Sequence, residues 1–287
     1  MTSRTMVSRQ LSQRTAFGLL MLATTIVIVP VLFIIIYMIV NGAGAISWEF
    51  LTQSPSQAGK AGGIFPAIVG TFYLMLGTLI FALPVGVTAG IYLTEYARDN
   101  WLTRLINTAI LNLAGVPSIV YGLFGLGVFV LALNFGMSLL AASFTLACQA
   151  LAMTITTSRE AILAVPREYK EGSLAVGATK WQTVRHIVLP QALPGIITGA
   201  VLAMSRAAGE TAPILVVGAA FFLPGLPQSP LDQFMALPYH LYTAAAHVPG
   251  MPKSTIWGVA LVLLVVVMSF NVLATVIRLR ARKRRYG

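Results

Sequence analysis

The chain has 287 residues, of which 57% are hydrophobic and only 9% are charged, and its formal net charge is +11. Because soluble domains carry about 25% charged residues, this composition excludes an ordinary soluble protein. The long apolar runs favour membrane-spanning helices over a β-barrel, and the basic residues at their ends suit membrane topology rather than a nucleic-acid partner.

The first predicted element is a transmembrane helix over residues 16–41. A basic tail, 1–15, precedes it. The apolar part of a signal peptide has about 7–15 residues, and this run is longer, so we expect a retained helix. The loop 42–65 that follows is rich in Gly, Pro, Ser and Gln and is expected on the outside.

Five further spans are predicted, because a spanning helix needs about 20 apolar residues. They lie near 66–93, 105–133, 137–157, 191–217 and 255–277. With their connections they form the predicted permease core, 66–280. We expect Pro84 to kink the second span or end its regular part, and Pro213 to make the fifth irregular. The predicted fold class is an all-α membrane protein with six transmembrane helices.

Lys and Arg residues predict the orientation. With the N-terminus inside, the inside segments hold sixteen of them, and the outside loops hold only Lys60 and Lys253. Cytoplasmic loops carry the excess of basic residues, so both termini are predicted to be cytoplasmic. The basic tail 281–287 would anchor this topology and offer a surface to anionic membrane lipid.

The cytoplasmic loop 158–190 is polar and yet carries the signals of folded helices. Pro166 suits a first helical position. Residues 167–176 are good helix formers, and Gly177 follows, the residue type preferred just past a helix end. The sequence therefore predicts a first short helix that ends at this glycine.

A second short helix is expected from Lys180 to about Val188, ending before Pro190. Thr179 and Gln182 form a capping-box pattern at its start. Two short helices joined at a glycine would make a compact projection about 15 Å long. From the residues alone, this projection either fills a cleft on a partner or lies idle on the membrane surface.

The spacing in this loop resembles the E-A-A-x3-G-x9-I-x-L-P loop of binding-protein-dependent ABC importer permeases. This chain reads EGS in place of EAA and agrees at the other fixed positions. The residues that match or replace the pattern are Glu171, Gly172, Ser173, Gly177, Ile187, Leu189 and Pro190. The resemblance implies a type I ABC importer permease fold and a loop, 166–190, that docks on an ATPase subunit.

Arg206 and Glu210 form the second candidate site. They are four residues apart, so a continuous helix would place them on one face. Arg206 lies about 18 Å past Pro194 along such a helix, near the middle of a hydrocarbon core about 30 Å thick. A charge there costs at least about 2.5–3.5 kcal/mol and marks a functional candidate.

Two interpretations of this pair remain open, and they do not exclude each other. In one, Arg206 and Glu210 simply hold the helix in the bundle. In the other, Arg206 contacts an anion in transit, since its planar fork of donors matches phosphate oxygens, while Glu210 moderates the attraction.

Three further stretches resemble the phosphate-specific permeases, and RAAGETAPIL with LPYHLY favours their A type. The stretches are LPVGVTAGIYLTEYA (83–97), GVPSIVYGLFGLGVFV (115–130) and MSRAAGETAPILVVGA (204–219). The resemblance implies a bacterial cytoplasmic-membrane subunit that imports inorganic phosphate. Its implied partners are a C-type permease, a dimer of ATPase subunits that bind ATP and magnesium, and an extracytoplasmic phosphate-binding protein. The resemblance gives the Arg206–Glu210 pair importance without fixing its role.

The remaining polar groups give weaker signals. Glu95, Arg98, Asp99 and Arg104 are interpreted as a solvated connector, and three scattered histidines have no metal-binding spacing. The chain has no P-loop, so no cofactor is expected on it and any ATP hydrolysis would occur in a separate subunit. The alternatives are a permease for another oxyanion, a secondary carrier that needs no ATPase, and a membrane-embedded enzyme.

Overall fold

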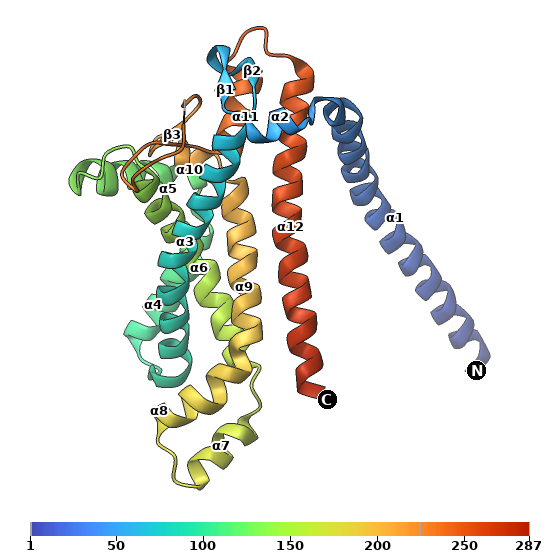
Figure 1. The fold of residues 1–287 in the computed structure, drawn as a ribbon. Helices are drawn as coiled ribbons and strands as arrows, with labels where there is room; N and C mark the ends of the chain where they lie inside the picture. Colours follow the sequence, from blue (N-terminus) through green and yellow to red (C-terminus); the bar gives the residue numbers. More distant parts are fainter. Residues whose placement is uncertain (1, 224, 287) are drawn as a thin grey trace.

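The computed structural model in Figure 1 describes residues 2–223 and 225–286. Side chains are described except those of 2–12, 14, 58, 274, 277, 278 and 280–286. The predicted contact of the tail 281–287 with lipid therefore lies outside the described side chains.

Long helices dominate the fold. They are α1 (Thr2–Gly42), α3 (Phe65–Ile91), α6 (Leu139–Leu163), α9 (Leu189–Gly209) and α12 (Lys253–Tyr286). The shorter helices are α2 (Trp48–Thr52), α4 (Trp101–Ala114), α5 (Ser118–Gly125), α7 (Arg167–Ala175), α8 (Lys180–Thr183), α10 (Ala212–Leu215) and α11 (Leu237–Ala246). Five helical segments are long and apolar enough to span a membrane, or six if α4 and α5 form one bent span.

Short irregular elements complete the chain. π-helical turns at Tyr92–Tyr96, Leu126–Ala132 and Val184–Val188 follow α3, α5 and α8, and 3-10 turns occur at Ala43–Ala45 and Gln57–Gly59. Strands β1 (Pro55–Ser56) and β2 (Ala61–Gly62) pair antiparallel, and β3 (Ala219–Ala220) and β4 (Phe234–Met235) pair parallel. Strands β1, β2 and β3 lie toward the end of the molecule opposite α7 (Figure 1), and β4 is there too because it pairs with β3.

The third span departs from the prediction of one helix over 105–133. Helix α4 ends at Ala114, α5 begins at Ser118, and the two are bent by 105°. Pro117 lies between them with ψ 140°, outside the helical range. Proline lacks an N–H and disfavours helix in the residue before it, which explains the break.

Pro84 does not end the second span. Helix α3 runs past it to Ile91 and continues through the π-helical turn to Tyr96. The carbonyl oxygen of Pro84 accepts a hydrogen bond from Thr88 Oγ1 at 2.7 Å. The group that Pro84 leaves without its helical donor is the carbonyl of Ile80, four residues earlier, so the Thr88 bond supports the turn after Pro84 and does not replace the lost bond.

Helices α3 and α6 pack closely because small residues line their contact. A Cβ atom on Gly86 would lie 2.5 Å from Thr154 Cγ2, and one on Gly90 would lie 2.9 Å from Ser158 Cβ. Small residues let membrane helices approach closely, where apolar burial alone does not drive association. Helix α9 packs against both members of this closely packed pair.

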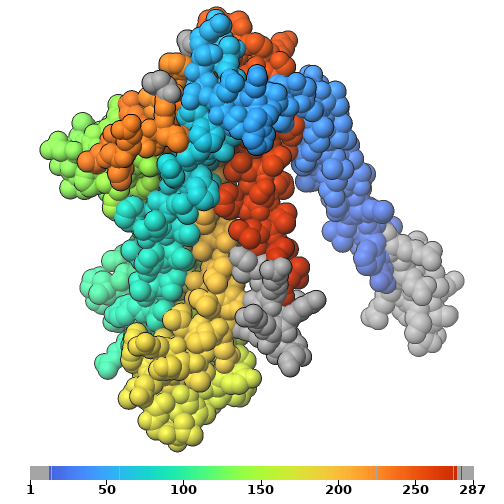
Figure 2. Space-filling view, viewed as in Figure 1, coloured from blue at the N-terminus to red at the C-terminus, as the bar shows by residue number. Residues whose placement is uncertain are grey.

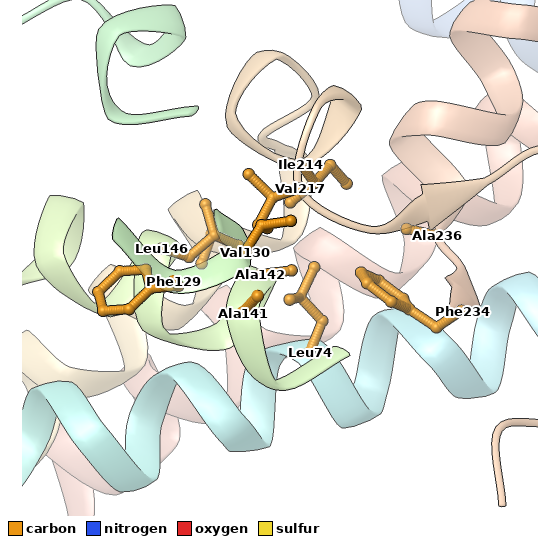
Figure 3. Close-up of a cluster of buried hydrophobic side chains, with 11 residues drawn as sticks. Leu74, Phe129, Val130, Ala141, Ala142, Leu146, Ile214, Val217, Phe234 and Ala236 are labelled. Carbon is orange, nitrogen blue, oxygen red and sulfur yellow. The ribbon is translucent and has the colours of Figure 1, made fainter. Parts of the chain in front are cut away.

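A hydrophobic cluster joins the broken third span to the rest of the bundle (Figure 3). Its buried members are Leu74, Phe129, Val130, Ala141, Ala142, Leu146, Ala207, Ile214, Val217, Phe234 and Ala236. They come from α3, the π-helical turn after α5, α6, α9, α10 and the β4 region. The cluster therefore fixes the segment that follows the first helix break, at Gly115–Pro117, and the segments on both sides of the second, at Glu210–Thr211.

Helix α1 contacts the bundle at its Gly42 end and diverges from it elsewhere (Figure 1). The Tyr37 ring packs edge-on against Trp257, with 5.1 Å between ring centroids. None of the apolar window of α1 is buried within the chain. Both chain ends lie toward the end of the molecule at which the α7–α8 segment projects (Figure 1), and Figure 2 shows this segment protruding below the rest of the bundle.

Candidate functional site

Arg206 and Glu210 lie at the point where the fifth span breaks. We predicted that both sit within one helix over 191–217, and this is wrong for Glu210. Helix α9 ends at Gly209, and Glu210 follows with an extended backbone, φ −75° and ψ 127°. Pro213 sits in the first turn of the next short helix, α10, and a proline there cannot continue the ladder of α9.

The two charged side chains nevertheless meet. Arg206 Nε lies 3.4 Å from Glu210 Oε1, which makes a long ion pair. The Arg206 side chain is 64% exposed and that of Glu210 is 18% exposed. No hydrogen bond from either terminal nitrogen of Arg206 occurs within the described part of the chain. The fork of the guanidinium therefore remains open to a ligand.

Gln149 on α6 completes the site, and sequence reasoning missed it. Its Nε2 atom donates to Glu210 Oε1 at 2.8 Å, the same oxygen that Arg206 approaches. Gln149 and Glu210 are 61 residues apart in sequence. A glutamine inside an apolar run is a weak signal by itself, and only helix packing brings it to the carboxylate.

A small pocket surrounds these three side chains. The other residues that line it are Leu146, Ala150, Met153, Ala203 and Ala207. Its volume is about 20 Å³, room for about one water molecule and too little for a phosphate ion. An anion that reaches Arg206 must therefore do so on its exposed side.

The two broken spans meet beside this site. A Cβ on Gly122 in α5 would lie 3.0 Å from Pro213 in α10, so the glycine allows close approach of the two segments. Tyr121 Oη donates to the carbonyl oxygen of Leu113 at 2.8 Å, and Val116 N–H donates to the same oxygen at 3.2 Å, so α5 is linked to the end of α4. Irregular backbone at membrane depth occurs where it is covered by protein or lines a cavity.

The α7–α8 segment forms the second site, and its first helix confirms the predicted boundaries to within a residue. Helix α7 ends at Ala175, and Gly177 follows with φ +85°. No atom lies within 4 Å of a Cβ built on Gly177, so the requirement for glycine is conformational rather than steric. The predicted capping box of Thr179 and Gln182 is also confirmed, with both hydrogen bonds present.

The second helix of the segment does not stop before Pro190, so that prediction is wrong. The helix runs on from Lys180 to Gly209, through a π-helical turn at Val184–Val188. Proline clashes with the carbonyl four residues earlier in an α-helix, and the wider π-helical turn before Pro190 relieves this clash. The projection is therefore continuous with the span that carries Arg206.

The base of the segment is anchored in the bundle. Val188 is buried with Ile162 and Val165, and Leu189 packs against the same cluster. Ser173 Oγ and Thr183 Oγ1 lie 3.0 Å apart and join α7 to α8. These contacts fix the angle at which the segment projects.

Two charge contacts attach the segment to the end of α3. The Lys170 ammonium forms an ion pair with the Glu95 carboxylate, and both side chains are mostly buried. Lys180 Nζ lies 5.1 Å from the centre of the Tyr96 ring, within the range of a cation–π contact. Glu95 was interpreted as part of a solvated connector, and for this residue the interpretation is wrong because α7 packs over it.

The predicted docking residues divide between the tip and the base. Glu171, Gly172 and Gly177 are exposed at the tip. Large apolar side chains also lie exposed on the segment, namely Tyr169, Leu174, Val176 and Trp181. Ile187 and Leu189 are only partly exposed, so they and Pro190 belong to the base where the segment joins α9.

Asp99 and Arg104 fit the solvated connector. They form two hydrogen bonds of 2.9 Å with both side chains exposed. The hydrogen bond from Arg104 lowers the pKa of Asp99, and the positive charge acts in the same direction.

The histidines fit a structural interpretation. His240 is buried, stacks on Phe221 and hydrogen-bonds to the Phe221 carbonyl oxygen. This burial lowers its pKa. The described residues contain no cluster of His, Cys, Asp and Glu suited to a metal ion.

Comparison with known proteins places these features in a family. The model for "Binding-protein-dependent transport system inner membrane component" matches residues 82–283. The chain is 35% identical over 209 residues to the probable ABC transporter permease protein YqgI of Bacillus subtilis, covering 73% of this chain and 71% of YqgI. It is 30% identical over 286 residues to the phosphate transport system permease protein PstA of Mycobacterium leprae, covering 98% and 93%.

A solved structure supports the same fold. A subunit of a bacterial ABC transporter involved in the import of the acidic polysaccharide alginate superposes with a TM-score of 0.62 at 16% identity. It covers 94% of this chain and 98% of that chain. The apolar spans, the projecting loop and the family match agree, and the chain belongs to the binding-protein-dependent transport system inner membrane components, with the fold of type I ABC importer permeases.

Proposed function

We propose that this chain is a translocation subunit of an ATP-driven importer of inorganic phosphate. The observation that carries the proposal is the open fork of Arg206 in a membrane-spanning segment, exposed along most of its side chain. Arginine stays charged at all physiological pH values and matches phosphate oxygens with parallel donors. The phosphate permease of Mycobacterium leprae, similar over nearly the whole chain, supports phosphate as the anion.

The exposure of Arg206 also supports a second permease subunit. A charged side chain at membrane depth does not face lipid; it faces protein or a water-filled cavity. In this chain alone the Arg206 face is uncovered, and the pocket beside it is too small for the anion. A partner chain must therefore close the pathway, and we propose a C-type phosphate permease in a heterodimer.

The α7–α8 segment would connect this pathway to ATP hydrolysis in separate ATPase subunits, which would bind ATP and magnesium. Its exposed apolar side chains, among them Trp181 and Leu174, can fill an apolar cleft. Glu171 forms no ion pair with any described residue, so it is available to orient the segment on the ATPase. We therefore assign no enzymatic activity and no cofactor to this chain.

The orientation follows from the same assignment. The α7–α8 segment and both chain ends share one end of the molecule (Figure 1). Sixteen of the nineteen Lys and Arg residues belong to the segments proposed to be inside, as the positive-inside rule expects. We propose that this end is cytoplasmic, so that an extracytoplasmic binding protein delivers phosphate to the opposite end.

In the proposed mechanism, closure of two ATPase subunits moves the docked segment. Because α8 runs without interruption into α9, this motion reaches Arg206, about 25 Å beyond Leu189 along the helix. The bundle then alternates between inward-open and outward-open states. Glu210 limits the strength of anion binding at Arg206, so that the anion is released.

The test uses the complete complex in liposomes with a panel of oxyanions. Phosphate-loaded binding protein should stimulate ATP hydrolysis and phosphate uptake together, while sulfate should do neither. If another oxyanion stimulates hydrolysis and uptake and phosphate does not, the chain is still part of an ATP-driven importer, and phosphate is the wrong substrate. Uptake without ATPase subunits would refute the proposal, because a secondary carrier needs none.

A further inference from the structure

Gln149 stands out because it contacts the charged pair without carrying a charge. Its amide lies between α6 and the break after α9, with Nε2 at 2.8 Å from Glu210 Oε1. A carboxylate only accepts hydrogen bonds, so the NH2 group must face Glu210. The amide oxygen, Gln149 Oε1, is buried without a hydrogen-bond partner.

An internal comparison indicates what this contact does. Asp99 and Arg104, on an exposed connector, form the bidentate pair expected of a free carboxylate and guanidinium, with two bonds of 2.9 Å. Arg206 and Glu210 make one contact, through Nε, at 3.4 Å. Charge-assisted N–H···O bonds are usually about 2.7–2.9 Å long. Arg206 and Glu210 therefore do not form the short bidentate pair that Arg104 and Asp99 form.

Gln149 supplies a direct reason for the difference. Its N–H occupies the oxygen of Glu210 that Arg206 approaches, and it ties the carboxylate to α6. The position of Glu210 beyond the end of α9 adds to the effect, because the pair lacks the geometry of two residues one helical turn apart. The terminal nitrogens of Arg206 are left without a hydrogen bond among the described residues.

We propose that Gln149 is a positioning residue for the transported anion. It restrains Glu210 so that the carboxylate weakens the positive potential at Arg206 without forming hydrogen bonds to the terminal nitrogens of the guanidinium. Without this restraint Glu210 would turn toward Arg206 and form the bidentate pair, and the anion would have to displace a carboxylate from the donors it needs. This inference rests on the proposed role of Arg206 in the pathway.

The first variant to test is Gln149→Met, which keeps the length of the side chain and removes its donor. Leu146, Ala150 and Met153 already make the surroundings largely apolar. The replacement also removes a buried oxygen without a partner, so assembly should not suffer. Gln149→Leu serves as a second apolar replacement, and loss of assembled complex in both variants would overturn the proposal by making Gln149 a packing residue.

Phosphate uptake and stimulated ATP hydrolysis are measured per assembled complex. With Gln149→Met we expect uptake to fall about tenfold. The free energy that a hydrogen bond to a charged group contributes corresponds to about this factor or more. Stimulated ATP hydrolysis should change less than about twofold, because the α7–α8 segment is untouched. A packing defect would instead lower both activities in parallel, and that outcome would overturn the proposal.

A second background separates positioning from packing. If Gln149 acts through Glu210, then Gln149→Met should cause no further loss in a Glu210→Gln chain, where no carboxylate can capture Arg206. Independent losses that multiply would overturn the proposal.

The Arg206→Gln chain distinguishes this inference from the proposed function. Normal uptake by Arg206→Gln would refute the pathway role itself. Normal uptake by Gln149→Met beside a defective Arg206→Gln would overturn only the role of Gln149.

Discussion

The α7–α8 segment and the Arg206 site lie at two ends of one continuous helical stretch, Lys180–Gly209, and they are specified in different ways. The helices of the segment are built from neighbours in sequence: a glycine with positive φ, a capping box and one contact between the hydroxyl groups of Ser173 and Thr183. The site is built from residues that tertiary packing brings together, since Gln149 comes from α6. Local sequence signals can therefore predict the helices of the α7–α8 segment, whereas the Arg206 site is assembled only when the helices pack.

This difference predicts how each region fails. Damage to the segment should lower stimulated ATP hydrolysis and transport together while the pathway stays intact. Damage to the site should stop the anion while the segment still docks. The following experiments test this division.

The largest effect is expected from Arg206→Gln. We expect phosphate uptake to fall about a hundredfold, because a charge-assisted hydrogen bond from Arg206 to the anion contributes about 1.5–3 kcal/mol. Copurification of the ATPase subunits checks that assembly is unchanged. Loss of the complex would instead assign Arg206 to holding the bundle together. Arg206→Lys is the matched control, which keeps the charge, loses the fork and should recover part of the uptake.

The next largest effect is expected from Gly177→Val. The φ of +85° is strained for a β-branched residue, and such strain costs about 1–3 kcal/mol. We expect uptake and stimulated ATP hydrolysis to fall together by about tenfold at unchanged membrane abundance.

Gly172→Ala is the matched control for this variant. A Cβ at Gly172 meets no atom within 4 Å, and Gly172 lies inside α7 with a helical backbone. Activity should therefore stay the same. An equal loss of activity in Gly172→Ala and Gly177→Val would mean that no added atom is tolerated at the tip of the α7–α8 segment. The positive φ of Gly177 would then not explain the loss.

A moderate effect is expected from breaking the Glu95–Lys170 ion pair. Lys170→Met leaves a mostly buried carboxylate without its partner. Uptake should fall about fivefold, which corresponds to about 1 kcal/mol. The exchanged pair, Glu95→Lys with Lys170→Glu, should recover much of the loss in the same assay. Failure to recover would indicate that Lys170 contacts the ATPase rather than α3.

The smallest effect is expected from Asp99→Asn. Arg104 lowers the pKa of Asp99 in the folded chain, so this carboxylate stabilises the fold above its unfolded pKa of about 3.9. That contribution is lost only as the pH falls through the lower folded value.

Thermal unfolding of the assembled complex tests this expectation. The Asp99–Arg104 pair is exposed to solvent. Between pH 6 and 8, the unfolding midpoint of the Asp99→Asn complex should therefore differ from that of the unchanged complex by less than about 1 °C. A larger shift in that range would place Asp99 in an interface with a partner.

The sequence predicted most elements because apolar length and helix punctuation are local properties. The first span, the end of α7 and the capping box at Thr179 needed no knowledge of distant residues. The breaks were harder, because Pro84 and Pro117 are both prolines in apolar runs. Helix α3 continues through Pro84, whereas the chain turns by 105° at Pro117.

Hydropathy and helix signals act over a few residues, so the amino-acid sequence was enough to predict a membrane-spanning chain with a folded polar projection and a permanent charge inside the fifth span. Three features became visible only in the folded chain: Glu210 lies beyond the helix end, Gln149 donates to its carboxylate oxygen, and the projection is continuous with the span of Arg206. Hydrogen bonds between helices depend on how the helices pack, and no local pattern of residues encodes that distance.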